Sequence, residues 1–242
     1  MTYLKSKKRG KGLAKSVVST ILIFLFAIVS SVILVSEKRK LRAFDERVFY
    51  FVSAGSSRKI SLLDDKKELL KNLGGANVVY EHRHLSHLLA SVYLKQEFAD
   101  EIKGNLLGHF PETEILKIKS KRVSTSGIRK IKEITGAEEF VKLIYKISVK
   151  FQDLQMSYLS GVLSESDFLS EMVGIRINLE KALENIDNSN DLANKIIENG
   201  GIFVFQLTNF LNGITIAKHR QNYVCNYFVE FYLRYVELFD CL

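Results

Sequence analysis

The feature that most constrains this chain is an uncharged stretch of 21 residues, from Ser16 to Ser36, close to its N-terminus. A helix needs roughly 20 consecutive apolar residues to cross a bilayer whose hydrocarbon core is about 30 Å thick. Basic residues lie on both sides of the stretch, where they can reach lipid headgroups. We therefore expect residues 16–36 to form one transmembrane helix between a tail (1–15) and a linker (37–47).

Two other interpretations of this stretch exist. A buried helix of a soluble protein is one of them. A cleaved signal peptide is the stronger rival, but its apolar region is normally about 7–15 residues long and ends at a small-residue cleavage site. Here the apolar run is longer and leads directly into Glu37-Lys38-Arg39-Lys40, which favours an uncleaved membrane anchor.

The basic residues also predict the orientation of the anchor. Residues 1–15 contain six basic residues and no acidic one, whereas residues 37–47 contain five basic and three acidic residues. Topology follows the count of Lys and Arg on each side. The small excess on the first side predicts a cytoplasmic N-terminus in the cell membrane, with the bulk of the chain outside the cytoplasm.

The distribution of charge argues against a nucleic-acid partner. The whole chain carries a net charge of +8, and the two segments that flank the apolar stretch account for all of it. Residues 48–242 are therefore neutral overall and provide no basic footprint for DNA or RNA. We expect the partners to be the membrane and, beyond it, a glycan or a protein.

Residues 48–122 combine strand and helix patterns in a regular order. Strand-like segments lie at 48–54, 78–83, 88–94 and 115–118, and helical spacing of leucines and other apolar residues lies at 62–73 and 96–109. The connection 84–87 is a candidate hairpin turn. The order is βαββαβ, which typically forms a small ferredoxin-like sheet with both helices on one face and the other face open.

These residues resemble the SPOR domain, a sporulation-related peptidoglycan-binding module. The first match is Ser53-Ala54-Gly55-Ser56-Ser57, and the second is Ala90-Ser91-Val92-Tyr93 followed by Ala99 and Leu106 at the family's spacing. The resemblance implies a single-pass envelope protein that binds glycan strands lacking stem peptides, in division or sporulation. It further implies that Ser53, Ser91 and Tyr93 approach the sugar from the open sheet face.

Three histidines, His82, His84 and His87, cluster beside Glu81. A zinc site needs three or four converging ligands, and this spacing matches no known zinc motif. We interpret them as exposed residues of a turn, and we expect neither a metal nor another cofactor.

Residues 127–242 are helical by pattern. Apolar residues recur at alternating intervals of three and four, with breaks at 161–167, 187–191, 200–201 and 218–221. Four or five antiparallel helices in a bundle would bury such stripes, although an oligomer interface is an alternative. Residues 200–217 contain Gln206, Thr208, Asn209 and Asn212, so we expect a buried helix there and not a second membrane span.

The chain contains no phosphate-binding glycine loop, nucleophile elbow or metal-binding helix motif, so we do not expect an enzyme. Two functions remain. One is an α+β membrane-anchored protein whose SPOR-like domain binds peptidoglycan. The other is a membrane-tethered scaffold whose helical domain recruits a protein partner and whose α/β domain has no glycan affinity.

Overall fold

The computed structural model describes residues 43–242. The predicted basic tail (1–15), transmembrane helix (16–36) and most of the linker lie outside this range. No helix between residues 43 and 242 has the combination of length and hydropathy that crossing a membrane requires. Residues Phe44–Leu242 form one compact unit.

The first part of this unit has the predicted βαββαβ order and forms a four-stranded antiparallel sheet with strand order β2-β3-β1-β4. Its elements are β1 (Val48–Ser57), a short 3-10 helix η1 (Ile60–Leu63), α2 (Asp64–Asn72), β2 (Val78–His82), β3 (Leu85–Tyr93), α3 (Gln96–Leu106) and β4 (Glu114–Lys119). The α+β class predicted from the sequence is therefore confirmed.

Two local details of the sheet differ from the predictions. Strand β1 continues through residues 55–57, because a register shift against β3 accommodates Gly55 at a φ of 153°. The β2–β3 turn consists of Arg83 and His84, both with positive φ, as a two-residue hairpin of type I′ requires. Strand β3 consequently begins earlier than predicted, at Leu85.

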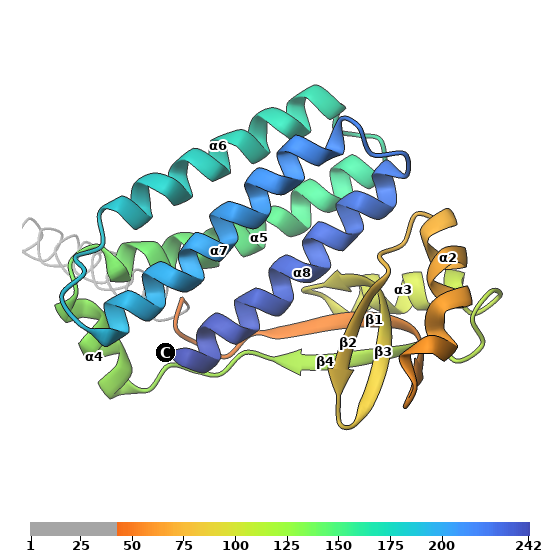
Figure 1. Ribbon diagram of the computed structural model, residues 1–242, viewed down its shortest axis with the longest axis horizontal. Coiled ribbons are helices and arrows are strands. Elements are labelled where there is room, and N and C mark those ends of the chain that lie inside the picture. Colours follow the sequence, from red (N-terminus) through yellow and green to blue (C-terminus); the bar gives the residue numbers. More distant parts are fainter. Residues whose placement is uncertain (1–42) are drawn as a thin grey trace, which may run out of the picture. The chain divides into compact units, whose positions relative to one another are not determined.

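Five helices follow the sheet and pack together (Figure 1). They are α4 (Thr125–Glu133), α5 (Ala137–Leu159), α6 (Glu165–Glu184), α7 (Asp191–Ile214) and α8 (Arg220–Cys241). The apolar stripes read from the sequence supply most of their buried residues. Residues 200–217 belong largely to α7, as the interpretation of a bundle helix requires.

The predicted break at 200–201 is wrong, because α7 runs through both glycines. A Cβ atom at position 200 would lie 2.2 Å from Cδ2 of Leu183 and 2.7 Å from Cζ of Phe140. Gly200 is therefore a point of close approach between α7 and the helices α5 and α6, and its role is close helix packing.

The sheet and the helices share one core. Helix α8 contacts β3 and β2 as well as α5 and α7, and Figure 1 shows it beside the strands. The ring of Phe49 in β1 lies 5.3 Å from the rings of both Tyr232 and Tyr235 in α8. The boundary near residues 122–127 thus marks a change of secondary structure, and the core is continuous across it.

The last residues of the predicted linker also belong to this unit. Phe44 is buried, and its carbonyl oxygen accepts a 3.0 Å hydrogen bond from the backbone N–H of Val123. The guanidinium carbon of Arg47 lies 4.1 Å from the centre of the Tyr145 ring, within the range of a cation–π contact. The chain is thus fixed to the helices immediately before β1 begins.

Candidate functional site: a pocket and a basic groove beside helix α8

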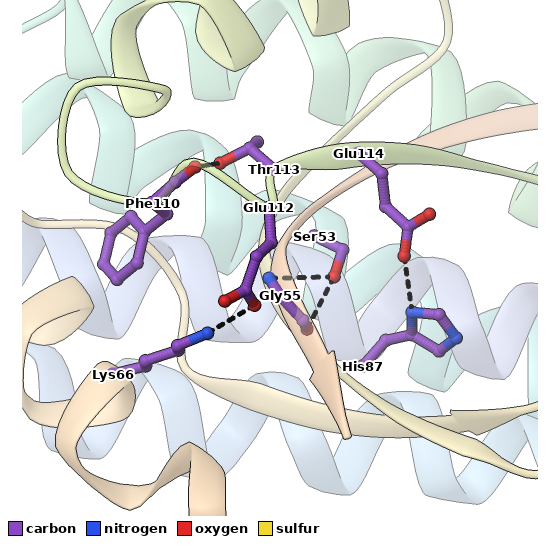
Figure 2. A network of polar contacts seen from close by, with 8 residues as sticks. All are labelled: Ser53, Gly55, Lys66, His87, Phe110, Glu112, Thr113 and Glu114. Carbon is purple, nitrogen blue, oxygen red and sulfur yellow. Dashed lines mark hydrogen bonds and ion pairs between the residues drawn. The ribbon is translucent and has the colours of Figure 1, made fainter. Parts of the chain in front are cut away.

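The three residues expected to contact a glycan are all buried. Ser53, Ser91 and Tyr93 are 0%, 4% and 3% exposed. The Ser53 hydroxyl donates to the carbonyl oxygen of Gly55 at 2.9 Å and accepts from the backbone N–H of Gly55 at 3.3 Å (Figure 2). Their expected position on an exposed sheet surface is therefore wrong.

The physical reason is that the sheet has no open face at its centre. Side chains of a strand alternate between the two faces, yet every residue of β3 from Ser86 to Tyr93 is buried. Ala54, Leu88 and Ala90 pack against Leu63 and Leu70, next to α2. Phe49, on the opposite face, packs against α8, which covers the face expected to be free.

The structure also separates Ser53 from the other two residues. Val52 packs with Tyr93 and with Ala99 of α3, so its neighbour Ser53 faces the other side of the sheet. Ser53 lies there near a 3.2 Å contact between Nδ1 of His87 and Oε1 of Glu114 (Figure 2).

Ser91 and Tyr93 instead line a pocket of about 260 Å³, which we call the junction pocket. It lies where the α2–β2 loop, β3, α3, the end of α5 and the start of α8 meet. Its lining residues are Leu73, Gly74, Gly75, Ala90, Ser91, Tyr93, Ile102, Asn105, Leu106, Leu159, Gln221 and Cys225. Ligand pockets commonly form at such junctions between packed units.

The junction pocket is uncharged. None of its lining residues is acidic or basic. Burial raises the pKa of the Cys225 thiol to about 12. Burial likewise raises the pKa of Tyr93 to about 12, although the nearby Ser91 hydroxyl opposes the shift. Both groups are neutral at physiological pH, so the pocket favours an apolar or uncharged group.

One polar atom in this wall has no partner. The Ser91 hydroxyl is buried, and although it lies close enough to Tyr93 to oppose the shift in that pKa, it makes no well-formed hydrogen bond within the described residues. A buried polar group without a partner costs about 1–3 kcal/mol. A ligand group that donates to or accepts from this hydroxyl would recover that cost.

The shape of the pocket depends on contacts between α8 and the α2–β2 loop. The side-chain amide of Asn222 donates to the carbonyl oxygen of Gly75, and Oδ1 of Asn226 accepts from the backbone N–H of Asn77 at 2.8 Å. Gly74 has a φ of 81°, and a Cβ atom there would lie 2.7 Å from Oε1 of Gln221. The positive φ thus favours glycine at position 74, and a side chain there would in addition displace Gln221 of α8.

A second concavity adjoins the junction pocket, and we call it the basic groove. Its volume is about 340 Å³, and it shares Leu73, Gly74 and Gln221 with the junction pocket. The other lining residues come from the end of α2 and from the α7–α8 connection; they are Lys71, Asn72, Ala217, Lys218, His219, Arg220 and Asn222. Three of them are basic and none is acidic.

Two of these cations have acidic neighbours outside the groove. Nη1 of Arg220 lies 2.5 Å from Oε2 of Glu165, and Nζ of Lys71 lies 3.3 Å from Oε2 of Glu68. Among the described residues, Lys218 has no ion-pair partner within 4.0 Å. The groove also faces the first turn of α8, whose unpaired N–H groups carry partial positive charge.

One of the three histidines is buried, whereas all three were expected to be exposed in a turn. His84 is exposed in the turn, but His87 lies in β3 and is only 4% exposed. Burial, followed by the charges of Arg83 and His87, lowers the pKa of His82. Among residues 43–242, no group of three or more His, Cys, Asp or Glu side chains is placed to hold a metal ion.

One segment of the sequence indicates a sheet that is covered on both faces. The segment Leu88 to Tyr93, LLASVY, has small or apolar residues at consecutive positions, without alternation between polar and apolar ones. Such continuous runs are typical of strands buried on both faces. The basic groove was not predicted, because Lys71 and Lys218 are 147 positions apart in the sequence.

No protein-family model, no curated protein and no solved structure matches this chain.

Proposed function

We propose that this chain is a single-pass membrane scaffold that recruits a protein partner through the region around the start of α8. In this proposal residues 16–36 anchor it in the cell membrane, the N-terminus is cytoplasmic and the bulk of the chain is extracytoplasmic. The sequence around the anchor supports that topology.

The observation that carries the proposal is the burial of the sheet on both faces. A binding surface on the sheet would require α8 to leave Phe49 and the rest of the apolar face on which it packs. The junction pocket and the basic groove, in contrast, are open concavities that need no such movement. They combine an apolar wall with a charged rim, which is common at protein interfaces.

Peptidoglycan binding is the second candidate. The βαββαβ order, with α2 and α3 contributing to the same apolar cluster, agrees with the SPOR resemblance. The burial of Ser53, Ser91 and Tyr93 disfavours this candidate, because an aromatic ring must be accessible to pack against a sugar.

A sedimentation assay separates the two candidates. Residues 44–242 and the detergent-solubilised full chain are incubated with purified sacculi, either untreated or stripped of stem peptides by an amidase. The scaffold proposal predicts that neither protein is retained. Retention that increases after amidase treatment would support the SPOR-like function and contradict the scaffold proposal.

Membrane anchoring needs its own measurement. Full-length protein should remain in the membrane pellet after carbonate extraction, and a variant that lacks residues 16–36 should be released. Release of the full-length protein would contradict the anchor.

A further inference from the structure

We propose that the junction pocket and the basic groove together bind an acidic peptide segment of the partner, with one aliphatic side chain in the pocket. This inference rests on the scaffold function proposed above and names the chemistry of the partner. It combines an apolar cavity, an adjacent set of cations and a buried hydroxyl without a partner.

The junction pocket fits one apolar side chain of the peptide. The junction pocket has a volume of about 260 Å³ and walls that include Leu73, Ile102 and Leu106. Binding interfaces typically place one or two large side chains in such pockets, and these side chains supply most of the affinity. Because the lining residues carry no charge, the pocket selects a side chain such as leucine or isoleucine.

The basic groove fits an acidic side chain of the peptide. Lys71, Lys218 and Arg220 line the groove next to the pocket, and no acidic residue lines it. Lys71 and Arg220 also pair with Glu68 and Glu165 beside the groove, so Lys218 is the cation that lacks an ion-pair partner among the described residues. The start of α8 adds the partial positive charge of a helix N-terminus. A carboxylate placed one or two residues from the aliphatic anchor would reach these groups, whereas a basic peptide would be repelled.

The unsatisfied hydroxyl of Ser91, which is 4% exposed, lines the pocket. A peptide backbone that enters the pocket mouth beside its anchor side chain brings both N–H and C=O groups. Either group can pair with this hydroxyl. The pocket thus suits a peptide better than a purely hydrocarbon ligand.

The test uses a phage-displayed library of random octapeptides selected on the immobilised unit, residues 44–242, and on the full chain in nanodiscs. We expect enriched peptides to contain Asp or Glu next to a single Leu, Ile, Val or Met. Enrichment of basic or purely aromatic peptides, or of no peptide at all, would overturn the proposal.

Charge-reversal variants then locate the site. Lys71→Glu combined with Lys218→Glu should weaken the best peptide roughly tenfold in fluorescence polarisation, because two attractions become repulsions. Both variants leave the Arg220–Glu165 pair intact. The matched control is Lys130→Glu with Lys132→Glu, two exposed lysines of α4, which should bind the peptide like the wild type. Equal losses in both double variants would contradict the assignment to the groove.

A pocket variant tests the anchor. Asn105 is exposed and lines the pocket mouth, so Asn105→Trp should fill the mouth without disturbing the core and weaken binding roughly tenfold or more. Glu101→Trp, on the same helix outside the lining residues, is its control. Unchanged affinity in Asn105→Trp would overturn the pocket assignment. If carbonate extraction releases the full-length chain from the membrane, the membrane scaffold is refuted. The proposal that the pocket and groove bind an acidic peptide would still stand.

Discussion

The side-chain amide of Asn222 in α8 donates a 2.5 Å hydrogen bond to the backbone carbonyl oxygen of Gly75, 147 positions earlier in the chain. Asn222 is only 6% exposed. This bond joins the last helix to the loop before β2, and it thereby links the helical part of the unit to the sheet.

Replacement of Asn222 by alanine should therefore destabilise the whole unit. The substitution leaves the Gly75 carbonyl without its partner, which costs about 1–3 kcal/mol in the free energy of unfolding. Urea denaturation followed by circular dichroism measures the change. Asn212→Ala, at an exposed position in α7, is the control and should leave the midpoint nearly unchanged. A midpoint for Asn222→Ala equal to that of the control would contradict the role of this bond.

Two adjacent glycines of α7 should respond in opposite directions. Gly200→Ala forces a methyl group against Leu183 and Phe140 and should lower the free energy of unfolding by about 1–3 kcal/mol. Gly201→Ala meets no atom within 4 Å and should raise it by about 0.5–1 kcal/mol, since alanine favours the helix. Thermal and urea unfolding of the two variants should bracket the wild type. A Gly200→Ala variant as stable as Gly201→Ala would show that the helices are less closely packed here.

The two cysteines should differ sharply in reactivity. Cys225 is buried and its pKa is raised to about 12, while Cys241 is exposed. Because the thiolate is the reactive form, an aromatic disulfide reagent at about pH 8 should titrate one thiol quickly and the second only after denaturation. The variant Cys241→Ser should lose the fast phase and Cys225→Ser should keep it.

The raised pKa of the Cys225 thiol also makes the free energy of unfolding depend on pH. Its pKa is higher in the folded unit than its ordinary value of 9.0, so the folded state binds this proton more tightly than the unfolded state. The contribution is constant below about pH 9 and is lost as the pH rises from about 9 towards 12. The free energy of unfolding should thus fall less steeply in Cys225→Ala than in wild type over this range. Parallel curves would contradict a buried thiol.

A fragment that contains only residues 48–122 should not behave as an independent domain. Without α8 it would expose Phe49 and Phe51, which are both 0% exposed in the intact unit. We expect this fragment to bind the dye ANS and to lack a cooperative urea transition, whereas residues 44–242 should show the reverse. Cooperative unfolding of the fragment without dye binding would contradict a core shared with α8.

Local patterns predicted much of the secondary structure, because helical periodicity and strand composition act over short distances. The stripe from Phe140 to Leu154 identified α5, and the βαββαβ order emerged with errors of only a few residues at the strand ends. Gly200 was misread as a break, because the sequence does not reveal that Phe140 and Leu183 lie against it.

The site was harder to predict. The resemblance that selected Ser53, Ser91 and Tyr93 covers only residues 48–122, so it carries no information about a later helix that packs on the sheet. The face of Phe49 and Ser53 is covered by α8, which begins more than 120 residues after Tyr93, whereas Tyr93 itself packs against Ala99 of α3. The junction pocket and the basic groove likewise arise from segments brought together only by tertiary packing.

Helix α8 follows the strands by about 100 residues or more in the sequence, and this order has a consequence for biosynthesis. The strands are synthesised long before the helix that covers them. Until α8 has been translated, Phe49 and its neighbours on that side of the sheet are not covered by it. The nascent chain therefore exposes this apolar surface until α8 has been synthesised, and the core shared by the sheet and the helices can form only then.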